Sequence, residues 1–389
     1  MPNKFVYMDY NATTPLHPLV KQALVDNLDL FANASSMHEQ GRQARSTIEA
    51  ARLYVAQLIG AQRNPEQLVF TSGGSESNNT VFATMFHLGR KQDRNQIITT
   101  AIEHPCVLNA AKWLESEGFP VHFLGVDGDG RIDLAELARL VNDKTLLVSI
   151  MAANNEIGTL QDMPAIGRIV KPSLSWLHCD ATQAVGKIPV DVESWQVDYL
   201  TLSSHKLYGP KGVGGLFVRK GAPLEPLIRG GHQEHGRRAG TYNSGAIAAF
   251  GLAASLARQE LPEYGQRLRA LRTRLVDGLL AAIPKIRVNG HPEQVLPNTL
   301  NISFPGAEGE AILLHLDLAG IAVSTGSACA SGSLDPSHVL MATGVGPELA
   351  HGSIRFSLGR GSTADDVDYV LATLPGIIAR LRSMSTVSF

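Results

Sequence analysis

Short apolar runs alternate with helical patterns between about residues 40 and 250, and this alternation constrains the fold more than any other feature of the chain. Seven of the runs have the length and composition of buried strands. They are residues 68–70, 97–100, 121–124, 146–150, 174–177, 197–202 and 213–218. Strands that alternate with helices are typical of βα units. The sequence therefore predicts an α/β domain built around a largely parallel sheet.

The ends of several helices carry their own signals. Residues 40–59 have a helical pattern that stops at Gly60, and glycine is the preferred residue just after a helix. Asp133 and Asp162 each precede a helical pattern, where an aspartate side chain can cap the first free N–H groups.

The pattern changes after about residue 250. Residues 245–283 predict one or two long helices. A strand, a helix, a strand and a last helix follow at 300–304, 309–318, 354–358 and 364–381. A chain of 389 residues is too long for a single hydrophobic core. We therefore expect a second, smaller α+β domain.

Composition excludes several classes of protein. The net charge of −2 predicts no broad surface for nucleic acid, and no apolar run is long enough to cross a membrane. The three cysteines, Cys106, Cys179 and Cys329, are too few and too scattered for a disulfide framework. We expect a cytoplasmic protein with reduced thiols, without a signal peptide and without a metal site.

Lys206 and Asp180 each follow or end a predicted buried strand. A lysine amine and a carboxylate at neighbouring strand ends suit pyridoxal 5′-phosphate (PLP), because the amine bonds the cofactor and the carboxylate keeps the pyridine nitrogen protonated. The sequence TSGGS at 71–75 connects a strand to a helix, so its backbone N–H groups can hold a phosphate. The alternatives are an ordinary surface lysine and a plain strand-to-helix turn.

Cys329 lies in a stretch of small and polar residues at 324–333, which cannot pack a core. This composition predicts a mobile loop with an accessible, nucleophilic thiol. Cys179, at a strand end, is better explained as a core thiol, and Cys106 is given no role.

Eight motifs occur in one order along the chain, and together they resemble the cysteine desulfurases of the NifS/IscS type, in the class V aminotransferase superfamily. They are DYNATTP at 9–15, TSGGSESNN at 71–79, EHP at 103–105, NNEIG at 154–158, DATQ at 180–183, SHK at 204–206, GSAC at 326–329 and SIRFS at 353–357. The resemblance implies the fold of type I PLP-dependent transferases. It divides the chain into a large PLP-binding domain at 14–255, with a mostly parallel seven-stranded sheet, and a small domain at 1–13 and 256–389 that carries the catalytic cysteine loop.

The resemblance also implies roles for individual residues. The catalytic residues would be Lys206, Cys329 and His104. The cofactor would be bound by Gly74, Ser75, His104, Asn155, Asp180, Gln183, Ser203, His205 and Lys206, and by Thr241 from the partner subunit of a homodimer with shared active sites. The substrate would be bound by Asn155 and Arg355, whereas Arg360 is interpreted as an ordinary exposed loop arginine.

The implied activity converts L-cysteine to L-alanine and leaves the sulfur as a persulfide on Cys329. Expected partners are L-cysteine, a second copy of the chain and a sulfur-acceptor protein such as an iron–sulfur scaffold, with an iron–sulfur cluster held transiently. Direct nucleic-acid binding and membrane binding are not expected. The alternatives are a selenocysteine lyase or another class V lyase or aminotransferase, and a non-catalytic sulfur-carrier subunit.

Overall fold

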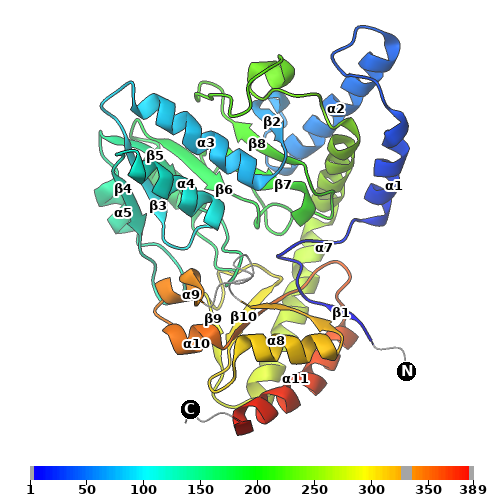
Figure 1. Ribbon diagram of the computed structural model, residues 1–389, viewed down its shortest axis with the longest axis vertical. Coiled ribbons are helices and arrows are strands. Elements are labelled where there is room, and N and C mark those ends of the chain that lie inside the picture. Colours follow the sequence, from blue (N-terminus) through cyan, green and yellow to red (C-terminus); the bar gives the residue numbers. More distant parts are fainter. Residues whose placement is uncertain (1–3, 326–334, 385–389) are drawn as a thin grey trace.

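The structure is a computed structural model that describes residues 4–325 and 335–384. A seven-stranded sheet fills the upper part of Figure 1, in the order β2-β8-β7-β6-β5-β3-β4. Its strands are β2 (Leu68–Thr71), β3 (Gln96–Thr100), β4 (Val121–Leu124), β5 (Thr145–Ser149), β6 (Trp176–Asp180), β7 (Tyr199–Ser203) and β8 (Gly214–Val218). Strand β8 runs antiparallel to its neighbours β2 and β7, and the other pairs are parallel. The predicted seven-stranded, mostly parallel sheet is confirmed.

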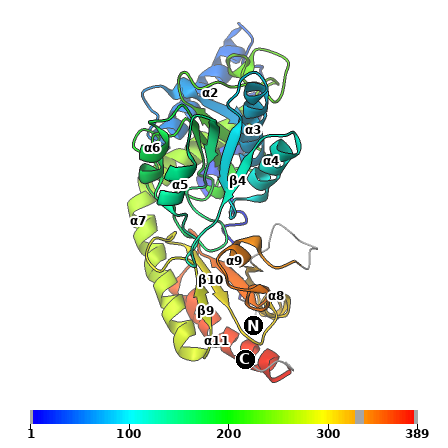
Figure 2. The same ribbon diagram turned by 90° about the vertical axis from the view of Figure 1, so that its left-hand side faces the viewer.

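Helices cover both faces of this sheet, as Figure 2 shows for α3 and α4 on one side and α5 and α6 on the other. The helices of this part are α1 (Pro18–Asp26), α2 (Glu39–Leu58), α3 (Gly74–Gly89), α4 (Pro105–Ser116), α5 (Leu134–Leu140) and α6 (Met163–Val170). Consecutive strand residues alternate between two cores. Ile97 belongs to the core to which α3 and α4 contribute, while Ile98 belongs to the core to which α2, α6 and α7 contribute. This double burial explains why the strands are continuous apolar runs.

The helix ends agree with their predicted signals. The Asp133 side chain accepts the N–H of Ala135 at 2.8 Å, and the Asp162 side chain accepts that of Ala165 at 3.0 Å. Gly60 follows α2 with φ of 78°, a left-handed conformation that glycine adopts without strain.

A second, antiparallel sheet occupies the lower part of Figure 1, in the order β12-β13-β10-β9. Its strands are β9 (Arg287–Asn289), β10 (Thr299–Ser303), β12 (Ser324–Thr325) and β13 (Ser353–Ser357). The helices beside it are α8 (Gly309–Leu318), α9 (His338–Ala342), α10 (Pro347–His351) and α11 (Ala364–Met384). Near the amino terminus, β1 (Val6–Tyr7) pairs in parallel with β11 (Ile321–Ala322). Val6 and Met8 join the core of this part.

One helix, α7 (Ser244–Ala282), runs alongside both sheets (Figure 2). Its first half contributes Phe250 to the core under α2, and its second half contributes Leu275 and Leu279 to the core of the small sheet. The sequence predicted either one or two helices in this region. The structure has a single helix, which continues through Pro262. The predicted domain boundary at residue 255 falls inside α7 and stays a prediction.

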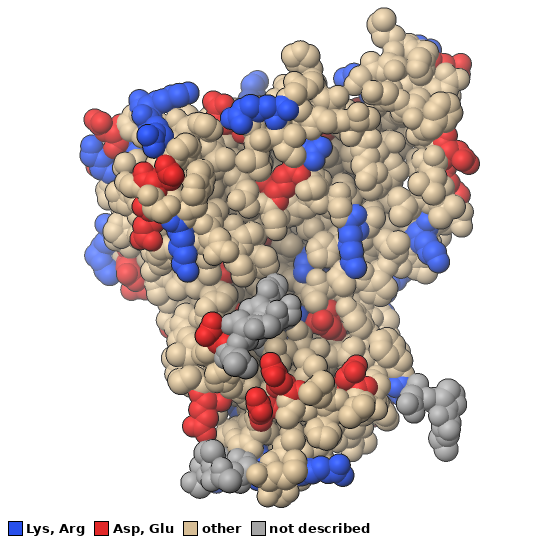
Figure 3. All heavy atoms as spheres, in the orientation of Figure 1, with Lys and Arg blue, Asp and Glu red and all other residues tan. Residues whose placement is uncertain are grey.

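The surface carries charges of both signs. Figure 3 shows Lys and Arg side chains interspersed with Asp and Glu over the visible face. Among the described residues, no helix combines the length and the apolar character needed to cross a bilayer.

Candidate active site

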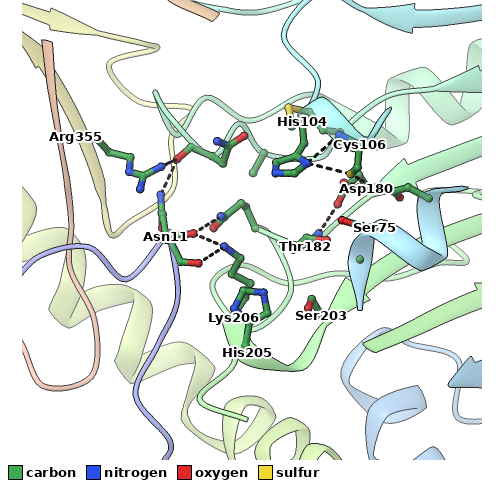
Figure 4. A pocket seen from close by; sticks show the side chains of 17 residues that line it. Asn11, Ser75, His104, Cys106, Asp180, Thr182, Ser203, His205, Lys206 and Arg355 are labelled. Carbon is green, nitrogen blue, oxygen red and sulfur yellow. Dashed lines mark hydrogen bonds between the residues drawn. The ribbon is translucent and has the colours of Figure 1, made fainter. Parts of the chain in front are cut away.

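A cavity of about 380 Å³ lies where the carboxyl ends of the central parallel strands meet the small sheet and the amino-terminal segment (Figure 4). It brings together residues from many parts of the chain. They are Asn11, Ala12, Gly74, Ser75, Asn78, His104, Cys106, Met151, Ala153, Asn155, Asp180, Thr182, Gln183, Ser203, His205, Lys206 and Arg355. Clefts beyond the carboxyl ends of parallel strands are the usual ligand sites of open α/β sheets.

Lys206 is carried into this cavity by the short 3₁₀ helix η3 (Ser204–Lys206), which directly follows β7. Its Nζ atom donates to the backbone carbonyls of Asn11 and, at 2.7 Å, of Ala12. The amine is thus aimed into the cavity by the large sheet and held there by the amino-terminal segment (Figure 4).

Asp180 ends β6, the neighbour of β7, so both predicted strand-end groups reach the same edge of the sheet. Its carboxylate accepts the Asn78 amide at 2.7 Å and the Thr182 N–H at 2.9 Å. These two donors fix the carboxylate while leaving it room to accept a further N–H from a ligand.

The start of α3 forms another wall of the cavity. A Cβ atom at Gly74 would lie 3.1 Å from Thr182 Oγ1, so glycine keeps this approach open. Thr182 Oγ1 is buried and has no hydrogen-bond partner among the described residues. Together with Ser75, Ser203 and the positive end of the helix dipole, this hydroxyl provides donors for an anion such as a phosphate group.

His104 caps α4, and its Nδ1 atom accepts the N–H of Cys106 at 3.2 Å. The neutral ring therefore carries its proton on Nε2. Burial lowers the pKa of His104, which favours this neutral form. The Cys106 thiol lies 3.0 Å from the same Nδ1, and burial raises the pKa of that thiol to about 12. Cys106 therefore supports the imidazole as a protonated donor and is a poor nucleophile.

Arg355 reaches the cavity from β13. Its guanidinium donates to Asp9 at 2.7 Å and to the Asn155 carbonyl at 3.1 Å. The side chain is buried, and its Nε atom has no hydrogen-bond partner among the described residues. The roles predicted for Arg355 and Asn155 in binding a substrate carboxylate remain predictions.

Asn11, Asn78 and Lys187 are among the residues in or beside the cavity that sequence reasoning did not assign to the site. Asn11 and Asn78 lie in the quoted motifs at 9–15 and 71–79, and Lys187 follows Gln183 by four residues. All three act through contacts between segments far apart in sequence. The Asn11 carbonyl accepts both Gln183 Nε2, at 2.9 Å, and the Lys206 amine.

One residue predicted to bind the cofactor, Thr241, does not line the cavity of this chain. Thr241 lines a separate pocket with Thr71 and Arg238, so its role toward a partner's site stays a prediction. Cys329 lies outside the described residues. Within those residues no cluster of three or more His, Cys, Asp or Glu side chains is arranged to hold a metal. Glu234 lies between His232 and His235 in the sequence, and its carboxylate pairs with Arg52 at 2.7 Å.

Comparison with known proteins agrees with this architecture. The sequence model of the family "aminotransferase class-V" matches residues 6–370. A cysteine desulfurase of Gluconacetobacter diazotrophicus is 49% identical over 98% of this chain and 95% of its own length. The cysteine desulfurase NifS of Azotobacter vinelandii is 45% identical over 98% of this chain and 94% of its own.

Solved structures give the same result. A NifS-like protein superposes with a TM-score of 0.91 and 40% identity, and the match covers 97% of this chain and all of the other. The chain therefore belongs to the class-V aminotransferase family, within its group of NifS- and IscS-type cysteine desulfurases. The resemblance read from the eight motifs is confirmed, as is the fold that it implied.

Proposed function

We propose that this protein is a PLP-dependent cysteine desulfurase, which converts L-cysteine to L-alanine and passes the sulfur to a thiol of its own, for iron–sulfur cluster assembly or other thiolation pathways. The observation that carries the proposal is a single cavity in which the Lys206 amine, the Asp180 carboxylate and the His104 imidazole converge, in a chain whose relatives over nearly its full length are cysteine desulfurases.

The residues of the cavity fit PLP. Lys206 would bond its aldehyde, Asp180 would accept the N–H of its ring, and the start of α3 with Ser203 and the unpartnered Thr182 hydroxyl would hold its phosphate. His205 would also face the phosphate as a neutral donor, since burial and the nearby lysines lower its pKa to about 4. When bound, PLP supplies an electron sink for the charge that develops on the substrate's α-carbon.

The protein's own groups would place the substrate and move its protons. Arg355, with a buried N–H still to be paired, would bind the substrate carboxylate together with Asn155. The Lys206 amine, once displaced, would take the α-proton, and the Nε2–H of His104 would donate a hydrogen bond beside it. Each group lines the cavity already, so little reorganisation is needed.

Sulfur transfer needs a nucleophile, and we assign it to Cys329. Its thiolate would attack the substrate's Sγ atom, forming an S–S bond while the Cβ–Sγ bond breaks and its electron pair stays with the carbon fragment. Protonation of that carbon gives alanine, and Cys329 keeps the sulfur as a persulfide. The atoms balance: one cysteine and one thiol give one alanine and one persulfide.

Two measurements test this proposal. Borohydride reduction of the PLP-loaded protein, followed by peptide mapping, should place the cofactor on Lys206; a label on another lysine, or none, would refute the assignment. Alkylation and mass spectrometry after reaction with L-cysteine should find the extra sulfur on Cys329. Cys329→Ser should lose it, whereas Cys179→Ala, a change to a buried core thiol, should retain it.

The alternative of a selenocysteine lyase, or of another class V lyase or aminotransferase, is not favoured, because the closely matching relatives are cysteine desulfurases. If Cys329→Ser formed alanine at the wild-type rate from L-selenocysteine but not from L-cysteine, that result would support a selenocysteine lyase.

The finer expectations on partners belong to the same proposal. They are a homodimer in which Thr241 of one subunit completes the phosphate site of the other, a sulfur-acceptor protein such as an iron–sulfur scaffold, and a transiently held iron–sulfur cluster. The cytoplasm is the proposed compartment, because a reactive thiol and a low cysteine content suit a reducing environment.

A further inference from the structure

We propose that Lys187 is a positioning residue, which locks the side-chain amide of Gln183 so that its NH₂ group, and not its oxygen, faces the cofactor cavity. The inference rests on the proposed function, because it assumes that Gln183 touches PLP. It adds a residue that neither the motifs nor the cavity lining assigns to the site.

Lys187 is a buried lysine, and among the described residues its amine donates to two neutral amide oxygens. It is 4% exposed, and its Nζ atom donates to Gln183 Oε1 and, at 3.2 Å, to Asn11 Oδ1. A buried lysine is costly, and burial together with the nearby Lys206 and Arg355 lowers the pKa of Lys187 well below its usual value. A methionine of similar size would fill the same space without this cost. The hydrogen bonds are therefore the feature that sets lysine apart here.

These hydrogen bonds decide which way the Gln183 amide points. Lys187 donates to the oxygen, so the NH₂ group must point away from it, and one of its two hydrogens binds the Asn11 carbonyl at 2.9 Å. The second hydrogen remains for a ligand in the cavity that Gln183 lines. With the amide reversed, the oxygen of Gln183 would face the Asn11 carbonyl, and two acceptors would oppose each other.

Asn11 is fixed in turn. Its Oδ1 accepts Asn298 at 3.0 Å as well as Lys187, and its Nδ2 donates to Thr299 at 2.8 Å. Its carbonyl receives both Gln183 and Lys206. Lys187 therefore supports, through Gln183, a hydrogen-bond donor that lies beside the reacting amine.

The test uses the full-length protein and measures PLP binding to the apoprotein, together with the visible absorption spectrum of the bound cofactor. Lys187→Met should raise the PLP dissociation constant about tenfold and change the spectrum, because the Gln183 donor is no longer held. Lys187→Gln keeps an N–H donor, so its PLP dissociation constant should lie between those of Lys187→Met and the wild type. Lys220→Met removes an exposed lysine that does not line the cavity, and it should change neither readout.

A double-mutant cycle separates positioning from a merely structural role. In a Gln183→Ala background, Lys187→Met should add almost nothing to the loss of PLP affinity. An undiminished tenfold loss in that background, or wild-type binding and spectrum for Lys187→Met, would overturn the inference. If Lys187→Met does not fold, Lys187→Gln is carried through the same cycle, with the same two outcomes.

The proposed function stands or falls separately. If Gln183→Ala binds PLP as the wild type does, while borohydride still fixes the cofactor on Lys206, this inference fails and the proposed function survives. If no cofactor is fixed on Lys206 in the wild type, the proposed function itself fails.

Discussion

Glu103 is a fully buried carboxyl group beside the active site, between the motif histidine and the sheet. Its Oε1 atom accepts the N–H of Met151 and the hydroxyl of Thr100, each at 2.8 Å, while Oε2 has no hydrogen-bond partner among the described residues. Burial raises the pKa of Glu103 to about 8. The group is therefore largely protonated in the folded protein at neutral pH.

A dependence of stability on pH follows. Between about pH 5 and 8 the folded state holds a proton on Glu103 that the unfolded state has released, so the free energy of unfolding should fall as pH rises through this window. Between pH 6 and pH 8, the free energy of unfolding of Glu103→Gln should fall by about 2 kcal/mol less than that of the wild type. Denaturant unfolding at the two pH values measures it.

Glu156 provides the internal control for this experiment. Burial raises its pKa to about 7, so it contributes to the fall in the same direction and remains in the Glu103→Gln variant. The variant should therefore keep a weaker dependence on pH. An unchanged slope would show that Glu103 is ionised in the folded protein.

At the scale of elements, the sequence predicted what local patterns determine. All seven strands of the large sheet were found, because both faces of each strand are buried and the runs are apolar. Strand β6 was predicted at 174–177, but it spans Trp176–Asp180. The apolar run in the sequence ends before His178 and Asp180, which are polar but buried in the structure. The short strands β1, β9, β11 and β12 were missed because two or three residues carry too little pattern, and β1 and β11 pair with each other across most of the chain.

The crossing of α2 and α7 depends on one glycine. A Cβ atom at Gly251 would lie 2.4 Å from the Cα atom of Ala51, a distance that no packing can accommodate without moving a helix. Gly251→Ala should lower the free energy of unfolding by about 1 to 3 kcal/mol. Thermal or denaturant unfolding measures the change.

Gly376, in α11, is the matched control, because no described residue other than its chain neighbours and the backbone of its own helix lies within 4 Å of the position of its added Cβ. Gly376→Ala should be neutral or stabilising by up to about 1 kcal/mol, since alanine favours helix more than glycine does. Equal losses for the two variants would mean that helix packing is not the cause.

At the scale of the whole molecule, the motifs identified most of the cavity lining but not the contacts that connect its parts. Lys206 and Asp180 could be predicted because their chemistry is visible in a short stretch of sequence, and His104 because its motif resembles that of the family. Asn11 could not, because its hydrogen bonds to Gln183 and Lys187 span more than 170 residues. Lys187 could not, because the sequence does not show that its amine is buried against Gln183. Cys329 was singled out by the composition of its surroundings, and its place relative to Lys206 remains a prediction.

The proposed dimer makes a prediction about shared sites. Thr241 is exposed in the single chain and lies outside the cavity, as expected of a residue that serves the partner. Lys206→Ala and Thr241→Glu, each inactive alone, should regain about a quarter of wild-type activity when mixed and allowed to exchange subunits. Random exchange makes about half of the dimers mixed, and each mixed dimer has one intact site of two.

The control is the double variant Lys206→Ala/Thr241→Glu mixed with the wild type. In its mixed dimers each site carries one defect, so subunit exchange should reduce the wild-type activity and not preserve it. Failure of the two single variants to complement, despite proven exchange, would place Thr241 and Lys206 in the same chain's site.

The amino-terminal segment has a mechanical consequence. Asn11 forms hydrogen bonds with Gln183, Lys187 and Lys206 on the side of the large sheet. On the side of the small sheet it forms hydrogen bonds with Asn298, Thr299 and Ser357. A tilt of one sheet against the other must therefore stretch or exchange bonds at the lysine amine itself. The angle between the two sheets and the position of the Lys206 amine are therefore coupled. Any motion that separates the sheets should also shift the amine in the cavity.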